Sequence, residues 1–573
     1  MKPEVLRYAV AVLFFSGLLS SARAVGDATW ETTPTSSYWY STTNWTPENV
    51  PNTINDTATF GVSSITTINE APGGLTTNLG AFVFTPGASA YTIDFSRDLY
   101  TVAEIAQGVT NDSGVLQIFS VPISSEFRDI NELNNVVSFI NSATAGALTQ
   151  WTAAGSSTGA YRPAEIIFND SSTAASGTFI INPGGSDRGG EDGDGFGGII
   201  DFRNSSTAGQ STINVNGGAA GADYGSAPSA YFTDEATAAD AIITMTGGTI
   251  PFADGGVLDF YLSSSAGNAQ ITNEGGAFGE AKPGQTSFHD TTTASNATII
   301  ADAGVEGASG GLVQFWDGST GESARLELFG NGTLDISFHS APGVTVGSIE
   351  GDGRVTLGAN RLTTGANRLS TTFSGVISGT GSLAKIGSGT LTLTGPNTYS
   401  GATQVSRGKL LMQDRTGSLM IIRGNVSAAG GAFGGSGRVG GAVIVGTPSG
   451  RPGTLEANEL RGGNFIIQKS LTFNSAATYQ VDLNSDAGRY SNVSAEGVTI
   501  SEGAFLTVKD IGNSSFGPVN LTIIVNTSSQ PIAGEFANLP EGGSITVGMN
   551  TFYASYHGGN GNDFTLTTVP PQP

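Results

Sequence analysis

The residue types that most often carry chemistry are sparse in this chain of 573 residues. It has 3 histidines, no cysteine, and 24 lysine and arginine residues against 48 aspartate and glutamate residues. His289, His339 and His557 lie far apart, at no spacing typical of a metal site. We therefore expect no zinc centre and no histidine-based catalytic triad.

The densest group of carboxylates is the segment GGSDRGGEDGDGFGG at residues 184–198. Calcium prefers several oxygen ligands on a flexible backbone, which this composition could supply. The spacing of Asp187, Glu191, Asp192 and Asp194 differs, however, from that of the twelve-residue calcium loop with its closing glutamate. We favour a solvated acidic loop and leave calcium binding open.

A second calcium-like pattern, GGNGNDFTL, runs from Gly558 to Leu566. It partly matches the glycine-aspartate nonapeptide of β-rolls, in which each ion is shared between successive turns. Only one copy is present, so the pattern favours a turn capped by Asp563.

Two segments match the G-x-S-x-G pattern of serine hydrolases, GSSTG at 155–159 and GASGG at 307–311. That chemistry requires a serine on a sharp turn between a strand and a helix, and neither segment has this context. We assign no catalytic residue, no cofactor site and no metal site.

A repeat predicts the elements that would position any site. The stretch FHDTTTASNATII at residues 288–300 recurs in variant form, and each copy begins with a phenylalanine. The repeat positions are Phe139, Phe168, Phe202, Phe232, Phe260, Phe288 and Phe315. A nearly constant period in the twenties to thirties is typical of a solenoid, in which each unit buries its apolar face against its neighbours.

Within each copy the pattern predicts two short strands around a tight corner. An apolar triplet ends at the phenylalanine, polar residues follow, and a second alternating segment begins near Phe179, Ile213 or their equivalents. The predicted fold class is therefore all-β, a parallel β-helix with coils of about 27–30 residues. Stacked coils lie about 4.8 Å apart, so the phenylalanine rings should form an interior column.

Acidic and amide residues recur two positions after the phenylalanines. They are Asn141, Asp170, Asn204, Asp234, Asp290 and Asp317, with Leu262 as the exception. Adjacent carboxylates in such a column would repel by about 3 kcal/mol per pair at an effective dielectric near 20. Because asparagine and leucine interrupt the column, we favour capping of the backbone by Asx turns.

Residues 373–412 read FSGVISGTGSLAKIGSGTLTLTGPNTYSGATQVSRGKLLM, which closely resembles the autotransporter-associated β-strand repeat of bacterial passenger domains. The matching positions are Gly381, Leu383, Lys385, Gly387, Gly389, Thr390, Leu391, Leu393, Gly395, Asn397, Tyr399 and Gly401. The resemblance implies a right-handed parallel β-helix, a secreted or cell-surface setting, and no catalysis by the motif. From the residues themselves we expect Lys385 to face away from Leu383 and Leu391.

The start of the chain predicts export. Lys2 and Arg7 precede the apolar run 9–19, and the small-x-small pattern at 22–24 predicts cleavage between Ala24 and Val25. No segment reaches the roughly 20 apolar residues of a transmembrane helix. The chain ends at PPQP without the translocator barrel typical of autotransporters, so we expect any passage across an outer membrane to require separate export machinery.

These patterns divide the chain into six regions. We expect a signal peptide at 1–24, an N-terminal β-rich cap with the first coils at 25–135, phenylalanine-register repeats at 136–345 with extruded loops at 184–198 and 217–231, the autotransporter-associated repeat region at 346–412, a C-terminal β-helix with a terminal strand pair at 413–569, and a tail at 570–573.

The leading functional prediction is an exported, non-enzymatic β-solenoid that acts as a cell-surface or extracellular-matrix scaffold or adhesin. Its expected partners are glycans or neighbouring cell surfaces, and the net charge of -24 argues against nucleic acid. Two alternatives stay open. One is a carbohydrate-active β-helix, either polysaccharide lyase-like or glycan-binding, and the other is a surface protein ordered by calcium.

Overall fold

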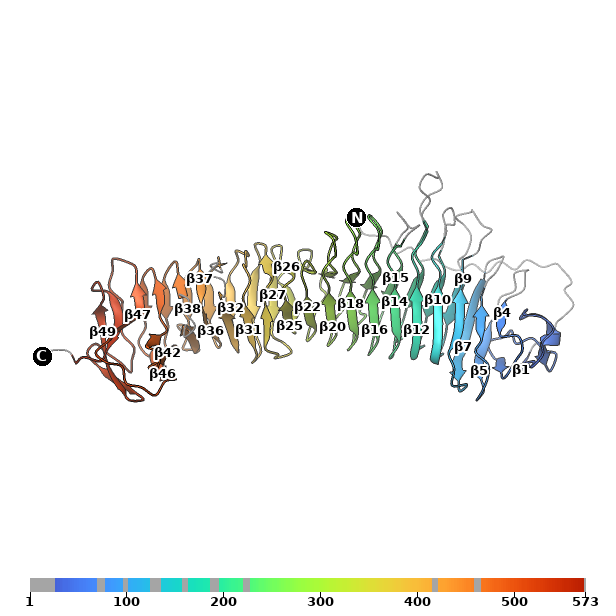
Figure 1. Ribbon diagram of the computed structural model, residues 1–573, viewed down its shortest axis with the longest axis horizontal. Coiled ribbons are helices and arrows are strands. Elements are labelled where there is room, and N and C mark those ends of the chain that lie inside the picture. The colour runs from blue at the N-terminus through green and yellow to red at the C-terminus, as the bar shows by residue number, and fades with distance from the viewer. Residues whose placement is uncertain are drawn as a thin grey trace.

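The computed structural model describes residues 26–69, 78–95, 101–123, 135–156, 163–185, 195–219, 227–414, 421–457 and 465–570. The predicted signal peptide, with Ala24 and Val25, lies outside these ranges. Apart from a single short 3-10 turn, η1 (Thr42–Asn44), the regular elements in them are all β-strands. The strands stack into a rod with the N-terminal coils at one end and the C-terminal coils at the other (Figure 1). No helix in these ranges is long and apolar enough to cross a membrane.

The first sheet runs along one face of the rod, and its strands are parallel from β3 onward. Its strands are β1 (Ala28–Trp30), β3 (Thr57–Phe60), β5 (Leu79–Phe84), β7 (Thr101–Asn111), β9 (Asn135–Phe139), β11 (Glu165–Phe168), β13 (Ile199–Phe202), β15 (Ser229–Phe232), β17 (Val257–Phe260), β19 (Gln285–Phe288), β21 (Leu312–Phe315), β23 (Thr333–Asp335), β26 (Arg354–Thr356) and β29 (Val376–Ser378). The register pairs Phe168 with Phe202 and Phe202 with Phe232. Each coil therefore places its repeat phenylalanine directly against the next.

The longest sheet forms another face and continues almost to the C-terminal end. Its parallel strands are β4 (Thr67–Asn69), β6 (Thr92–Asp94), β8 (Gln117–Val121), β10 (Ala147–Ala153), β12 (Ser176–Ile181), β14 (Thr212–Val215), β16 (Ile242–Met245), β18 (Gln270–Asn273), β20 (Thr298–Ala301), β22 (Arg325–Leu328), β25 (Ser348–Gly351), β28 (Thr371–Phe373), β31 (Thr390–Leu393), β33 (Lys409–Met412), β36 (Ala432–Gly435), β39 (Gly453–Ala457), β42 (Ala477–Asn484) and β46 (Phe505–Asp510). Phe179, Ile213 and Ile243 pair in register in this sheet.

Between these faces lies a corner that widens into a sheet of its own. In the earlier coils it is a column of single bridges that joins Thr173, Thr207 and Thr237. Later it becomes β24 (Gly343–Val346), β27 (Arg361–Thr364), β30 (Ser382–Lys385), β32 (Thr403–Val405), β35 (Val426–Ala428), β38 (Val443–Val445), β41 (Leu471–Phe473) and β45 (Val498–Ile500). The coil is thus three-sided, and the apolar residues of all three sides form one continuous core.

A further sheet follows the first sheet in the C-terminal coils and ends in a hairpin. Its strands are β34 (Ile421–Ile422), β37 (Gly437–Val439), β40 (Phe465–Ile467), β44 (Val493–Ala495), β47 (Asn520–Asn526), β50 (Asp563–Thr567), β49 (Asn550–Gly558) and β48 (Ser544–Val547). The antiparallel strands β48 to β50 cover the end of the solenoid. At the other end, β2 (Trp45–Thr46) pairs antiparallel with β1, and Trp30, Trp39 and Trp45 pack together.

The expected coil length of about 27–30 residues, typical of a β-solenoid, holds only for part of the rod. Later coils are shorter, because Arg354 pairs with Val376 and Thr390 pairs with Lys409. The difference lies in the connection that leads from the longest sheet back to the first sheet. It forms projecting loops before β17 and β19 and shrinks to a short turn between β25 and β26. The middle coils are therefore shorter because this loop is lost, whereas the last coils are long again, since Phe465 pairs with Val493 and Leu471 pairs with Val498.

The expected loop at 217–231 extends too far, because Ser229–Phe232 forms strand β15 of the first sheet. This strand pairs in register with β13 on one side and β17 on the other. The other expected loop, 184–198, falls largely on residues 186–194, which lie outside the described part of the chain.

Candidate functional site

The seven repeat phenylalanines lie in the interior and are fully buried. Their rings stack nearly parallel, with centroids 4.6 Å apart for Phe139 and Phe168 and 4.9 Å apart for Phe288 and Phe315. This distance matches the spacing of neighbouring strands. The column stabilises the stack of coils and is closed to any ligand.

The polar column two positions after each phenylalanine caps backbone groups between coils. The backbone N–H of Asn141 donates to Asp170 Oδ2 at 2.8 Å, and that of Asp170 donates to Asn204 Oδ1 at 3.0 Å. Each residue has a positive φ, 55° at Asp170 and 54° at Asn204, which asparagine and aspartate tolerate best. The expectation of Asx turns was therefore wrong in one respect, because each side chain caps the preceding coil rather than its own.

Lys385 does not face away from Leu383, as we expected, but lies on the same inward face with an exposed fraction of 1%. Residues two apart in a strand share a face, and Lys385 pairs with the buried Thr364 and Val405. Its ammonium donates to the backbone oxygens of Ile386 at 2.5 Å and Gly387 at 3.2 Å. Burial lowers the pKa of Lys385 to about 8.

The other positions of the family motif also serve the stacking of coils. Leu383, Leu391 and Leu393 are buried, Asn397 Oδ1 accepts the backbone N–H of Ile377 at 3.1 Å, and Tyr399 Oη lies 2.6 Å from Thr403 Oγ1. A Cβ added to any of five motif glycines would collide with a backbone oxygen of the preceding coil. These are Gly381, Gly387, Gly389, Gly395 and Gly401. Thr390 is only partly buried, at the start of β31.

The candidate calcium residues are not brought together. Asp187, Glu191, Asp192 and Asp194 fall outside the described residues. Asp563 does not cap its own turn but accepts the backbone N–H of Asn526 at 2.9 Å, which ties the terminal hairpin to β47. Where the structure describes the chain, it holds no group of three or more residues that could ligate a metal ion.

The serine-hydrolase patterns and the histidines give no catalytic arrangement. Ser309 lies in the connection between β20 and β21 and is followed by a strand rather than a helix. Of the other pattern, residues 157–159 lie outside the described part. His339 places both ring nitrogens against backbone oxygens, 2.6 Å from Ser340 and 2.7 Å from Ser319, and so links two coils.

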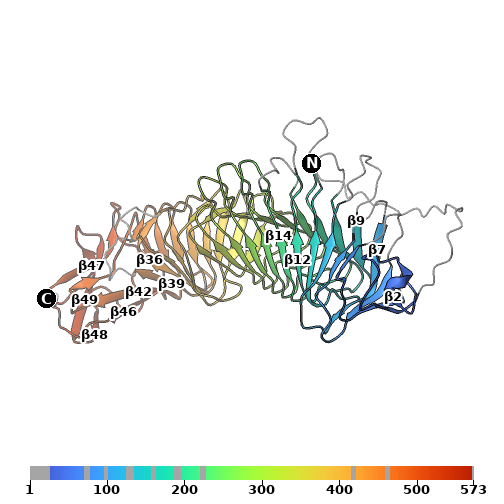
Figure 2. The ribbon, with the colours of Figure 1, turned by 45° about the vertical axis from the view of Figure 1, so that its right-hand side comes forward.

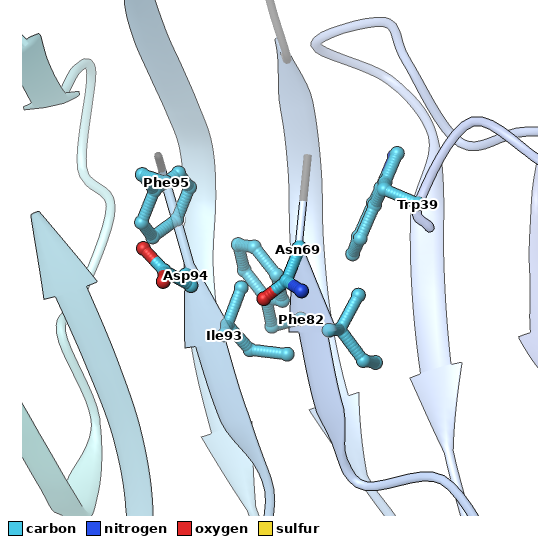
Figure 3. A pocket seen from close by; sticks show the side chains of 7 residues that line it. Trp39, Asn69, Phe82, Ile93, Asp94 and Phe95 are labelled. Carbon is cyan, nitrogen blue, oxygen red and sulfur yellow. The ribbon is translucent and has the colours of Figure 1, made fainter. Parts of the chain in front are cut away.

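A pocket lies near the N-terminal end, between β4 and β6. It is lined by Trp39, Ile68, Asn69, Phe82, Ile93, Asp94 and Phe95. Figure 3 shows Trp39 on one side of it and Phe95 on the other. Asn69 and Phe95 are each the last residue of a described range, so we assign no site to this pocket.

The outer surface of the first sheet carries the strongest candidate for a binding site. We call it the outer strip and define it by outward-facing side chains of this sheet, most of them at the phenylalanine end of successive strands. Its members are Glu165, Asp201, Arg203, Tyr231, Asp259, Tyr261, His289, Trp316 and Phe338. Most of them directly precede or follow a repeat phenylalanine, so the repeat register stacks them in columns.

Four aromatic rings of the outer strip form a ladder along the rod. The centroids of Tyr261 and His289 are 4.7 Å apart, those of His289 and Trp316 are 5.8 Å apart, and those of Trp316 and Phe338 are 4.4 Å apart. All three pairs stack within 23° of parallel. Phe338, at the end of the ladder, has an exposed fraction of 59%.

The carboxylates of the outer strip lie at the start of the ladder or on the coils before it, and they are largely buried. Arg203 Nε donates to Asp201 Oδ2 at 2.6 Å, and its Nη2 lies 3.3 Å from Glu165 Oε1. Burial raises the pKa of Asp201, although the Arg203 guanidinium opposes that shift. Burial likewise raises the pKa of Tyr261, and the nearby Asp259 carboxylate adds to the effect.

Three buried polar atoms of the outer strip have no hydrogen-bond partner. They are Oδ1 of Asp201, Oδ1 of Asp259 and Nε1 of Trp316. Asp259 has only loose neighbours, with Tyr261 Oη 3.5 Å from its Oδ2 and His289 Nε2 3.7 Å from its Oδ1. Buried polar groups without partners are uncommon in proteins, and they are consistent with a site that a ligand completes.

An alignment of the repeat copies contains a signal for this site. Aligning the copies on the phenylalanine places Arg203, Tyr261, His289 and Trp316 in one column and Asp201 and Asp259 in another. No two of these four residues in the first column are alike, so no repeated motif appears. Only the stacking of coils makes them neighbours.

Part of the chain matches a known repeat family. Residues 383–412 match the passenger-associated-transport repeat. This confirms the passenger-type resemblance drawn from residues 373–412. The match covers the buried lysine and four of the five glycines described above, and it extends from β30 to β33.

Similar proteins include an adhesin autotransporter and an adhesin of solved structure. The BmaC adhesin autotransporter of Brucella suis biovar 1 is 38% identical over 96 residues, which are 16% of this chain and only 3% of that protein. The crystal structure of the Haemophilus influenzae Hap adhesin aligns with 89% of this chain and 63% of its own, at 12% identity and a TM-score of 0.28, a likeness too distant to bear on function. The protein is therefore an all-β parallel solenoid that carries a repeat of the autotransporter passenger type.

Proposed function

We propose that the protein is an exported, non-enzymatic rod that acts as a cell-surface or extracellular-matrix adhesin or scaffold. The observation that carries this proposal is the continuous parallel solenoid (Figure 2). Its register stacks outward side chains of successive coils in columns. A rigid rod of this kind offers many equivalent contacts to an extended partner. The passenger-type repeat and the similarity to an adhesin support the same function.

The proposed setting is outside the cytoplasm. The basic and apolar start of the chain supports export, and the absence of cysteine means that no disulfide is needed for stability. A protein of net charge -24 repels acidic polymers. Contacts through hydroxyl, amide and aromatic groups with uncharged partners are therefore favoured. Glycans and neighbouring cell surfaces are the proposed partners.

Attachment of coated beads tests the proposal. Residues 25–573 are coupled to fluorescent beads, which are applied to cultured cells and to extracellular polysaccharide matrix, with and without calcium. Beads that carry the heat-unfolded chain serve as a control of equal composition. We expect attachment that depends on the folded chain and that releases no sugar product.

Two results would contradict this function. Equal attachment of folded and unfolded chain would exclude an adhesin that acts through its folded surface. Reducing or unsaturated sugars in the supernatant would show an enzyme and overturn the non-enzymatic part of the proposal.

A further inference from the structure

The outer strip ends in an aromatic surface that no part of the described chain covers. One face of the Phe338 ring stacks on Trp316, and the ring is 59% exposed. The next coil carries only small residues at the matching places, because Gly358 lies against Ser337 and is followed by Ala359. An aromatic ring exposed in this way presents an apolar face to a flat partner.

The same strip holds unpaired groups that can hydrogen-bond a ligand. Asp259 is only 9% exposed, yet its Oδ1 lacks a hydrogen-bond donor. The 3.7 Å between His289 Nε2 and this oxygen is too long for a hydrogen bond. Trp316 Nε1 is an unpaired donor two coils further along the rod than Asp259. Both atoms are shielded from solvent, so a ligand that reaches these side chains needs groups that both donate and accept hydrogen bonds to satisfy them.

A pyranose ring combines the two properties that the strip offers. Its C–H faces are apolar and can stack on an aromatic ring, while its equatorial hydroxyls both donate and accept hydrogen bonds. The negative charge around the outer strip narrows the class of sugar that can bind there. Glu165 and Asp201 share one guanidinium, and the exposed Asp290 and Asp317 flank the ladder. Anionic sugars would be repelled at this surface.

We propose that the outer strip binds uncharged pyranose oligosaccharides, which lie along the rod with one ring on Phe338 and a hydroxyl that donates to the carboxylate of Asp259. The two residues are three coils apart, or about 14 Å at the usual strand spacing. That span requires an oligosaccharide rather than a single sugar. The inference deepens the proposed function, on which its biological meaning rests, because it assigns the ligand class and the residues that select it.

Calorimetric titration of residues 25–573 with defined hexasaccharides tests this inference. The probes are linear hexamers of β-1,4-glucose, α-1,4-glucose, β-1,4-N-acetylglucosamine and, as the anionic control, α-1,4-galacturonic acid. We expect at least one uncharged hexamer to bind and the galacturonic acid hexamer not to bind. Monomeric sugars should bind far more weakly than hexamers.

Substitutions then locate the site. Phe338→Ala removes an exposed ring and Asp259→Asn replaces a carboxylate by an amide of the same shape, so both should keep the fold. Each should weaken binding of the uncharged hexamer about tenfold. Phe278→Ala is the matched control, since Phe278 is an exposed aromatic residue, 50% exposed, in the loop before β19. Its binding should equal that of the unsubstituted chain.

The outcomes separate this inference from the proposed function. Binding of no uncharged hexamer, or equal binding by all three variants and the parent chain, would overturn the inference even if coated beads still attach to cells. If a hexamer binds but coated beads do not attach to cells or matrix, the sugar site is supported and the adhesin function is overturned. Cleavage of a bound hexamer would show a catalytic site instead of a binding site.

Discussion

Lys385 illustrates how the solenoid determines the environment of a single side chain. Its charge suggested a surface position, whereas strand alternation places it on the same face as Leu383 and inside the coil. The backbone oxygens of Ile386 and Gly387 make that position tolerable, because they accept hydrogen bonds from the ammonium. A sequence pattern could predict the strand but not these acceptors, which depend on the turn after Lys385.

The lowered pKa of Lys385 predicts a pH-dependent stability. In the unfolded chain this amine keeps its proton up to about pH 10.4, whereas in the folded chain it loses the proton near pH 8. Between these values the unfolded state binds more protons, so stability rises with pH. Relative to Lys385→Met, the parent chain should gain about 1 to 2 kcal/mol in free energy of unfolding from pH 7 to pH 10, after allowance for solvent screening.

Urea unfolding of both chains at pH 7 and pH 10 measures this difference. The Lys385→Met chain is the reference at each pH, so titration of all other groups cancels. A gap between the two chains that is the same at both pH values would show that the amine has the same pKa in the folded and unfolded states.

At the scale of a coil, the inward positions of the phenylalanine repeats could be predicted from the sequence and the outward ones could not. The phenylalanine register is visible because one inward position keeps one residue type through seven coils. The outward column keeps no single residue type, because side chains that face outward need not fit a packed core. Its members are Arg203, Thr233, Tyr261, His289 and Trp316. The outer strip therefore appears only when the coils are stacked.

The polar column two positions after each repeat phenylalanine predicts a stabilising substitution at Leu262. This residue has a φ of 61° and no side-chain acceptor, so the backbone N–H of Asp234 lacks the cap that Asp290 gives to Leu262 at 3.0 Å. Leu262→Asn would supply the missing oxygen in a backbone conformation that asparagine favours. We expect the free energy of unfolding to rise by about 1 kcal/mol.

A urea titration of the Leu262→Asn chain measures this gain, and Leu262→Ala is the matched control. Leu262 is 50% exposed, so the alanine variant loses little buried surface and gains no acceptor. Equal stability of the asparagine and alanine variants would show that the cap between coils contributes nothing at this corner.

At the scale of the whole molecule, the rod must close its two ends because every coil depends on its neighbours. The three tryptophans and β2 cover the first coil, and the hairpin β48 to β50 covers the last. The final hairpin could be predicted because residues 552–569 resemble the terminal strand pair usual in proteins with these repeats, whereas the anchoring of Asp563 to Asn526 depends on a strand far away in sequence. These caps keep the edge strands from pairing with other chains.

Removal of the last cap should therefore make the chain associate more strongly. A chain of residues 25–527 keeps β47, whose partner β50 is lost, and uncovers Phe473 and Tyr479, which pack on Phe536. The exposed edge and the apolar surface beside it both favour association. We expect soluble oligomers or precipitate at concentrations at which residues 25–573 stay monomeric, as measured by light scattering after size-exclusion chromatography.

The matched control for this truncation changes the hairpin without uncovering the edge of β47. Met549→Ser alters a residue that is 69% exposed in the turn between β48 and β49, so the chain should stay monomeric. Association of the truncated chain alone would then be due to the loss of the cap, because only that chain exposes an unpaired strand. A truncated chain that stays monomeric and folded would show that β47 needs no cap, and that the solenoid can end on an open strand.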